Sequence, residues 1–314
     1  MSRSTRTRLV AASGALVLTA LALTACGSDD GSGTDAGGGL DSVKITGDIG
    51  EAPKVTWEGE VDPKDIETEV VTEGDGEVIE AGDGALAHIW IGNGFTEEEA
   101  YNSYESKAPQ LLIGEISEPF KKALEGHKVG SRVAVAANAT DAFGETGNSQ
   151  LGIGNKDGLV FVVDLMARVG DEPAGEEREA AKWSPSLVEA DGVITGFDFA
   201  EANKPSKNLL DTTLIKGDGA VVESGQTIAV NYLGQVYDAK APFDESYSKD
   251  PTSFPIGVGQ VVAGWDKALV GKTVGSRVIL SIPPADGYGD KGNKDAGIKG
   301  TDTLFFVIDI LAAA

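Results

Sequence analysis

Val261-Val262-Ala263-Gly264-Trp265-Asp266-Lys267-Ala268-Leu269 is the clearest helical pattern in the second half of the chain. At helical spacing its apolar side chains gather on one face, and a glycine follows as a stop signal. The residues on that face are Val261, Trp265, Ala268 and Leu269, and the glycine is Gly271. A short helix with one apolar face is stable only when it packs against another element.

The partner of this helix is a sheet, because the segments around it favour strands. Residues 227–234 and 275–282 alternate apolar and polar side chains, and residues 303–310 are almost wholly apolar. Alternation with a period of two indicates strands with one buried face. The sequence therefore predicts an α+β domain in which the helix covers the single apolar face of a sheet.

The chain contains this unit twice. Three pairs of segments match at a constant offset of 145 positions: 126–133 with 271–278, 141–148 with 286–293, and 159–164 with 304–309. Solenoid and propeller units recur every ~20–50 residues, so this longer offset indicates a duplicated domain. We expect a first copy at residues 42–169, a linker rich in Glu, Ala and Gly at 170–183, and a second copy at 184–314.

The pattern of the first 25 residues predicts a signal peptide. A basic start precedes an apolar run at residues 9–22, which is shorter than the ~20 residues of a membrane span. Leu23-Thr24-Ala25-Cys26 then resembles a bacterial lipobox, in which Cys26 is the lipidation site. A plain secretory signal is the alternative. With the Gly-rich tether at 26–41, the resemblance implies a protein anchored by lipid to the extracytoplasmic face of the cell membrane.

The composition excludes several classes of function. The net charge of −24 argues against nucleic acid as a partner, because phosphate binding needs basic surfaces. Cys26 is the only cysteine, and the two histidines, His88 and His127, form no cluster and are interpreted as structural. We therefore expect no metal, no cofactor and no cysteine nucleophile.

The second copy resembles the FKBP-type peptidyl-prolyl cis-trans isomerases over about a hundred residues in order. The motifs that carry the resemblance are Gly225-Gln226, Val230-Asn231-Tyr232-Leu233-Gly234, Phe243-Asp244, the run from Phe254 to Trp265, Val274-Gly275-Ser276-Arg277, Ile282-Pro283-Pro284, Tyr288-Gly289 and Leu304-Phe305-Phe306. The resemblance implies two FKBP-like domains, each a twisted five-stranded antiparallel sheet wrapped on a short helix. It also implies an apolar cavity between sheet and helix.

By this resemblance, the catalytic residues are Tyr232, Asp244, Trp265 and Tyr288. The implied substrate-binding residues are Phe243, Phe254, Val261, Val262, Ile298 and Phe306, although core packing is a competing interpretation for Phe254. Three residues depart from the family pattern: Thr252 for an aromatic, Gln260 for an acid, and Asp286 for an aromatic or Leu. These departures bear on substrate preference and macrolide affinity.

The residue types suit the reaction on physical grounds as well. Rotation about an X–Pro amide gives up resonance against a barrier of ~18–20 kcal/mol, and no bond is broken. A pocket that removes water and binds the twisted amide best is therefore sufficient. Aromatic walls grip the proline ring, and a hydroxyl or backbone N–H can hold the carbonyl.

The first copy keeps the strand-forming positions and loses much of this set. We place Trp90 at the position of Tyr232, Phe120 at that of Trp265 and Phe143 at that of Tyr288, so two hydroxyls are lost. Tyr101-Asn102 stands where the second copy has Phe-Asp. We interpret the first copy as a degenerate domain with weak or no activity.

The sequence thus predicts a monomeric peptidyl-prolyl isomerase that assists the folding of exported proteins. The expected partners are proline-containing peptides, unfolded exported proteins and macrolides such as tacrolimus or rapamycin. Two alternatives stay open: a peptide-binding chaperone, and a surface-binding lipoprotein with little isomerase activity.

Overall fold

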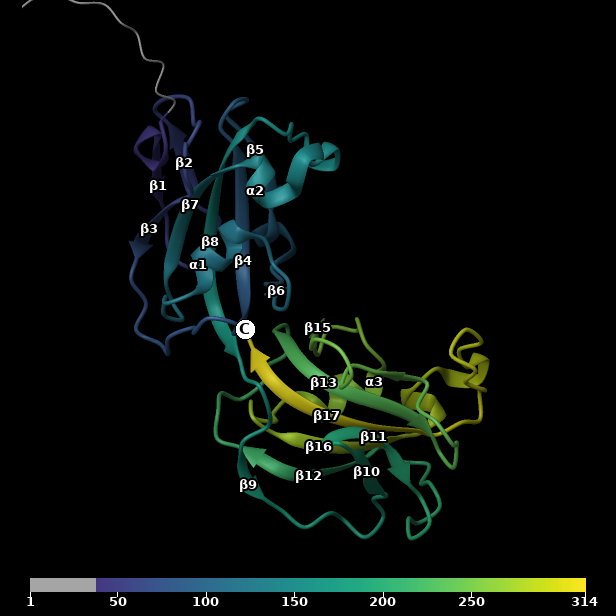
Figure 1. Cartoon of the computed structure of the whole chain (residues 1–314). Coiled ribbons are helices and arrows are strands. Elements are labelled where there is room, and N and C mark those ends of the chain that lie inside the picture. The colour runs from purple at the N-terminus through teal and green to yellow at the C-terminus, as the bar shows by residue number, and fades with distance from the viewer. Residues whose placement is uncertain (1–37) are drawn as a thin grey trace, which may run out of the picture. The chain divides into compact units, whose positions relative to one another are not determined.

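The computed structural model describes residues 38–314, and both copies form mixed α+β units in it (Figure 1). The predicted signal peptide and Cys26 lie outside the described residues. Each copy has one main sheet, in which all strand pairs are antiparallel. The predicted α+β fold, with a short helix packed on an antiparallel sheet, is confirmed, but the sheets have six and seven strands rather than the expected five.

The sheet of the second copy has the order β14-β13-β17-β16-β12-β9, and β15 pairs with β13 off this path. Its elements are β9 (Gly175–Glu177), β12 (Leu210–Gly217), β13 (Thr227–Val236), β14 (Asp244–Glu245), β15 (Thr252–Pro255), α3 (Ala263–Leu269), β16 (Arg277–Ile282) and β17 (Leu304–Ala313). Strand β9 comes from the predicted linker, which is therefore joined to this sheet through its pairing with β12.

The sheet of the first copy has the order β3-β7-β8-β4-β5, and β6 pairs with β4 off this path. Its elements are β3 (Glu67–Thr72), β4 (Gly84–Asn93), β5 (Glu98–Asn102), β6 (Gln110–Leu112), α1 (Glu118–Leu124), β7 (Arg132–Asn138), α2 (Ala139–Phe143) and β8 (Gly158–Val169). Ser117 is the residue before α1, but its side chain makes no capping hydrogen bond.

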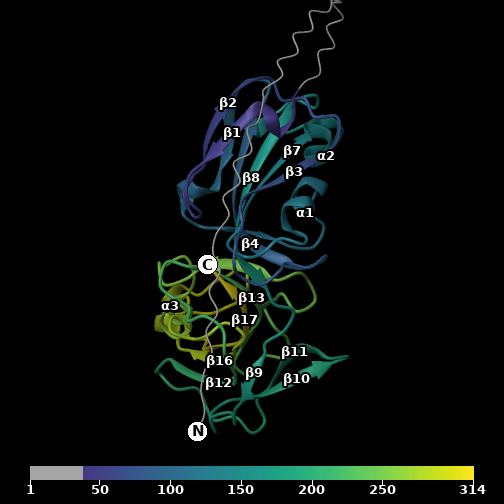
Figure 2. The same cartoon turned by 90° about the vertical axis from the view of Figure 1, so that its left-hand side faces the viewer.

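The face of each sheet opposite the helix is also buried, which the alternation along the strands did not predict. A hairpin covers it: β1 (Val43–Thr46) and β2 (Lys54–Trp57) in the first copy, and β10 (Ser186–Ala190) and β11 (Val193–Asp198) in the second. Figure 2 shows, in each copy, the hairpin on one side of the sheet and the helix on the other. Because both faces are covered, nine of the ten residues of β17 are buried.

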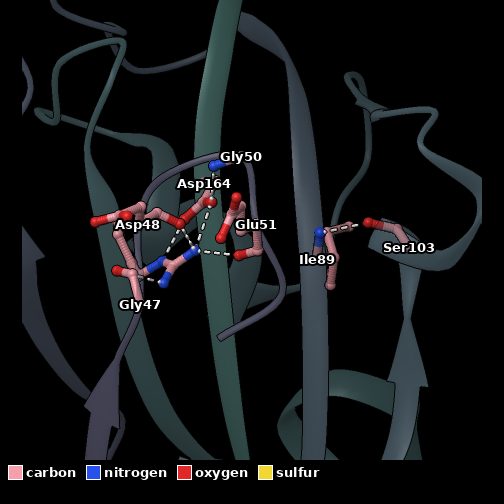
Figure 3. A network of polar contacts seen from close by, with 8 residues as sticks. Gly47, Asp48, Gly50, Glu51, Ile89, Ser103 and Asp164 are labelled. Atoms are coloured by element: carbon pink, nitrogen blue, oxygen red, sulfur yellow. Dashed lines mark hydrogen bonds and ion pairs between the residues drawn. The ribbon is translucent and has the colours of Figure 1, made fainter. Parts of the chain in front are cut away.

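An Arg–Asp ion pair lies at the same place in both sheets, fully buried in the first copy and partly exposed in the second. Arg132 donates to both carboxylate oxygens of Asp164, at 2.7 and 2.8 Å, and Arg277 does the same to Asp309, at 2.7 Å each. In the first copy the guanidinium also donates to three carbonyls of the β1–β2 turn, those of Gly47, Asp48 and Glu51 (Figure 3). The turn is thereby held against the sheet.

Candidate active site

A cavity of about 460 Å³ opens between α3 and the sheet of the second copy. Its walls come from β13, β14, β15, α3, β17, the loop before α3 and the segment between β16 and β17. The lining residues are Tyr232, Phe243, Asp244, Phe254, Gln260, Val261, Val262, Ala263, Trp265, Gly287, Tyr288 and Phe306. The size and the mainly apolar lining are those of a small-ligand pocket.

Aromatic rings meet edge to face around the cavity. The ring of Trp265 lies 5.5 Å from that of Tyr232, 5.3 Å from Phe254 and 5.4 Å from Phe306, at interplanar angles of 78° to 87°. Phe243 meets Phe306 at 5.6 Å. Such pairs each contribute ~0.5–1.5 kcal/mol beyond the area they bury, so the rings hold one another in place.

One polar contact is built into this apolar wall. The Tyr232 hydroxyl donates to Oδ2 of Asp244 at 2.5 Å, and the other carboxylate oxygen accepts from the backbone N–H of Glu245. Burial, and then the hydrogen bond to Asp244, raise the pKa of the Tyr232 hydroxyl above its usual value. The hydroxyl therefore keeps its proton across the neutral range, and the carboxylate is fixed in orientation.

The structure brings together all four predicted catalytic residues, Tyr232, Asp244, Trp265 and Tyr288, around the cavity. It also places five of the six predicted substrate-binding residues in the lining: Phe243, Phe254, Val261, Val262 and Phe306. The exception is Ile298, which is 3% exposed and packs in the hydrophobic core of the same copy rather than in the lining.

Three lining residues were not among the predicted site residues. They are Gln260, which departs from the family pattern, and the two small residues Ala263 and Gly287. Ala263 and Gly287 carry no chemistry of their own, so composition gives no signal for them. Their proximity to Trp265 and Tyr288 in the sequence was the only available indication.

Strand pairing corrects the position assigned to Trp90. Tyr232 pairs with Ile308 in the second copy, and the matching partner in the first copy, Val163, pairs with Ile89. Ile89 therefore occupies the position of Tyr232. Side chains alternate between the faces of a strand, so Trp90 lies on the opposite face, where its indole N–H donates to Glu99 under the β1–β2 hairpin.

The same pairing shows what fills the site in the first copy. Ile91 stands at the position of Gly234, Tyr101 at that of Asp244, and therefore Ala100 at that of Phe243. The sequence-based placement of Tyr101-Asn102 at Phe243-Asp244 is therefore wrong by one residue. A Cβ on Gly234 would come within 2.6 Å of both Phe243 and Phe306, so this glycine leaves room for the two rings. Phe120 and Phe143 occupy the predicted positions and pack against the core, with Phe120 edge to face on Phe161.

Among residues 38–314 no group of three or more His, Cys, Asp or Glu side chains is arranged to hold a metal ion. Over the same residues, no helix is long and apolar enough to cross a membrane.

Comparison with known proteins agrees with this geometry. The model of the FKBP-type peptidyl-prolyl cis-trans isomerase family matches residues 219–311. The FK506-binding protein of Streptomyces anulatus is 38% identical over 110 residues, which are 35% of this chain and 89% of that protein. Peptidyl-prolyl cis-trans isomerase FKBP15-1 of Arabidopsis thaliana is 42% identical over 122 residues, covering 38% of this chain and 72% of that protein.

A solved structure, the peptidyl-prolyl cis-trans isomerase PPIase of Pseudomonas syringae pv. tomato, is 31% identical, with a TM-score of 0.31. The match covers 34% of this chain and 75% of that one. The family model and the extent of the two sequence matches identify this chain as a member of the FKBP-type peptidyl-prolyl cis-trans isomerase family.

Proposed function

We propose that the pocket of the second copy catalyses prolyl isomerisation by binding the twisted amide. The observation that supports this most is the aromatic pocket with a single fixed polar pair, Tyr232 and Asp244, in its wall. The rings around Trp265 hold the proline ring and keep water away from the amide. An amide in a dry pocket loses the solvation that favours its planar, charge-separated form, so rotation becomes easier.

The polar residues act on the rotating carbonyl and its neighbours. The Tyr288 hydroxyl, on a residue that is 38% exposed at the rim, donates to a substrate carbonyl. The Asp244 carboxylate, held by Tyr232, offers negative charge on one side of the amide. These contacts accelerate the reaction only to the extent that they are stronger in the twisted state than in either planar state.

The rate of exchange of a proline-containing peptide, measured by NMR line shape, tests this mechanism. We expect catalysis to be flat between pH 6 and 9, because the raised pKa of Tyr232 keeps its hydroxyl protonated there and both histidines lie outside the lining. Tyr288→Phe should lower kcat/KM about tenfold with little loss of stability, which corresponds to ~1.4 kcal/mol. A bell-shaped profile near neutrality would contradict the twisted-amide account.

We further propose that proline-containing segments of unfolded exported proteins are the substrates, and that macrolides of the tacrolimus and rapamycin class enter the same pocket. The Streptomyces anulatus relative is named for FK506, which supports the second part. Competition between tacrolimus and a proline peptide for the pocket, followed by Trp265 fluorescence, tests it. Fluorescence that tacrolimus leaves unchanged would contradict it.

The proposed location is the extracytoplasmic face of the cell membrane, with lipid on Cys26 as the anchor. The lipobox-like tetrapeptide and the apolar run before it support this proposal. Cys26→Ser should move the protein from the membrane fraction to the medium with unchanged isomerase activity. A variant that stays in the membrane fraction would show that something other than this lipid holds it.

A further inference from the structure

Two loops form the rim of the pocket, and their positions set its width. The first, residues 256–262, carries Gln260, Val261 and Val262, and the second, residues 283–292, carries Gly287 and Tyr288. Both loops lie outside the strands, and Gln260 and Tyr288 are exposed. The backbone hydrogen bonds of the sheet therefore do not hold these two loops in place, and other contacts must hold them.

The first rim loop is held by Asp266 of α3. One carboxylate oxygen accepts from the backbone N–H of Gly257 at 2.6 Å, and the other accepts from that of Gly259 at 2.8 Å. Hydrogen bonds to an ionised acceptor are roughly twice as strong as neutral ones. Both glycines have φ near +78°, so the carboxylate holds a turn that other residues would resist forming.

The second rim loop is held by the next residue of the helix, Lys267. Its Nζ lies 2.5 Å from Oδ1 of Asp286, which directly precedes the lining residues Gly287 and Tyr288. The lysine side chain is 59% exposed, so this ion pair is sensitive to salt. Three consecutive helix residues thus shape the pocket. Trp265 forms its floor, Asp266 holds the first rim loop and Lys267 holds the second.

The first copy shows that the fold does not need these contacts. Its helix α1 has Lys121 and Lys122 at the positions of Asp266 and Lys267, and both pair with Glu118 of the same helix, at 3.8 and 3.9 Å. Asp141, at the position of Asp286, forms no ion pair within residues 38–314. The helix, sheet and loops are nevertheless present, so the contacts are specific to the copy that has the aromatic pocket.

We propose that Asp266 and Lys267 are positioning residues that set the two rims of the isomerase pocket. Neither lines the cavity. Asp266 fixes the loop that bears Val261 and Val262, and the Lys267–Asp286 pair fixes the loop that bears Tyr288. This inference rests on the proposed function for its effect on turnover, but not for its effect on the loops.

The first test compares Lys267→Met and Asp286→Asn with a matched control in the full chain. Lys272→Met removes an ion pair of the same length, 2.5 Å to Asp211, away from the pocket lining. We expect kcat/KM to fall three- to tenfold in Lys267→Met and Asp286→Asn, with the urea midpoint of the second copy within the range of the control. Turnover equal to that of Lys272→Met would overturn the proposal.

Charge exchange and salt separate positioning from a general structural role. The double variant Lys267→Asp with Asp286→Lys restores an ion pair and should recover at least half of the lost kcat/KM. Salt at 1 M should reduce the turnover of the wild type and of Lys272→Met more than that of Lys267→Met, which has no pair left to screen. An unrescued double variant, or equal salt responses, would count against the proposal.

Hydrogen exchange measured by mass spectrometry reads the loops without relying on catalysis. Asp266→Ala should speed exchange in residues 256–262, Lys267→Met should speed it in residues 283–292, and Lys272→Met should change neither. If the wild type shows no turnover, the proposed function fails while this readout still tests the two contacts. Unchanged exchange in both loops would overturn the inference even in an active enzyme.

Discussion

Gly234 is the residue on which the shape of the pocket depends most closely. The space beside its Cα is taken by the rings of Phe243 and Phe306, and in the first copy the side chain of Ile91 occupies the matching position. A single methyl group here would have to push both rings, because contacts of 2.6 Å are not sustained by real Cβ atoms.

Gly234→Ala should therefore lower kcat/KM at least tenfold while the sheet still forms. Overpacking of this kind typically costs ~1–3 kcal/mol of stability, so the second copy should remain folded at 25 °C. The NMR exchange assay gives the turnover, and urea unfolding gives the stability. Wild-type turnover in a folded Gly234→Ala protein would show that the rings are not held as closely as the geometry indicates.

His88 gives the first copy a pH response. It is 7% exposed, stacks on Tyr104 at 4.6 Å and contacts the Ser103 hydroxyl through Nδ1. Burial lowers its pKa, while the nearby Asp164 carboxylate opposes that shift. His88 lines a surface pocket of the first copy, and the other charged residues that line it are Glu51, Glu105 and Lys107.

The sign of the response follows from this lowered pKa. The unfolded chain, with a histidine pKa of about 6.5, binds the proton more readily than the folded one. The contribution of His88 to the stability of the first copy is therefore present above the unfolded-state pKa of about 6.5 and is lost as the pH falls below it. His88→Asn, which installs the residue found at position 231 of the second copy, should flatten this dependence in urea unfolding between pH 5.5 and 7.5. If the stability of the variant depended on pH as steeply as that of the wild type, the response would belong to another group.

At the scale of elements, the hairpins that cover the outer faces are bound in different ways. In the first copy Arg132 and Asp164 are fully buried, and the guanidinium also holds the β1–β2 turn through three carbonyls (Figure 3). In the second copy the Arg277 side chain is 20% exposed, and its side-chain hydrogen bonds all go to Asp309. The β10–β11 hairpin instead packs through Ile194 and Phe197 onto Phe305.

Arg132→Met should accordingly destabilise the first copy by ~3–5 kcal/mol, because it leaves the buried Asp164 carboxylate without its partner. Arg277→Met is the matched control and should destabilise the second copy less, since water can reach part of that site. Hydrogen exchange along β8 and β17 reports the two copies separately. Equal losses in both would show that the turn contacts add nothing.

The sequence predicted the helix and the main strands of each copy, because their periodicity is strong and local. It did not predict the two covering hairpins, whose strands are only four to six residues long. The almost wholly apolar run of β17, interrupted by Asp309, was the available signal, since a strand buried on both faces shows no alternation.

The pocket residues were predictable only through the family resemblance, and the register was the weak point. Trp90 was placed one position away from the true equivalent of Tyr232, and in a strand one position reverses the face. The pairing partners that fix the register are more than seventy residues away along the chain. The resemblance also implied Ile298 as a pocket residue, but Ile298 packs in the hydrophobic core of the second copy.

In the whole molecule, the elements that form the fold occur in both copies, whereas the residues that form the pocket occur only in the second. Both copies keep the sheet, the helix and the Arg–Asp pair, and these elements satisfy the requirements of a stable core. The second copy alone combines Gly234, the Phe243–Asp244 pair and the two rim contacts of α3. We expect all turnover of the full chain to arise there.

If both copies catalysed isomerisation independently, their rates would add. A variant that impairs the second copy would then reveal the turnover of the first. Asp244→Asn in the full chain removes the carboxylate charge from the second pocket, so kcat/KM should fall about tenfold or more, and tacrolimus should remove the remaining turnover. Tyr101→Phe is the matched change at the same position of the first copy and should leave turnover within error of wild type. A first copy with its own activity would leave a floor in Asp244→Asn that tacrolimus does not remove, because Ile91 and Tyr101 stand there in place of Gly234 and Asp244. Such a floor would show that prolyl isomerisation does not need this pocket.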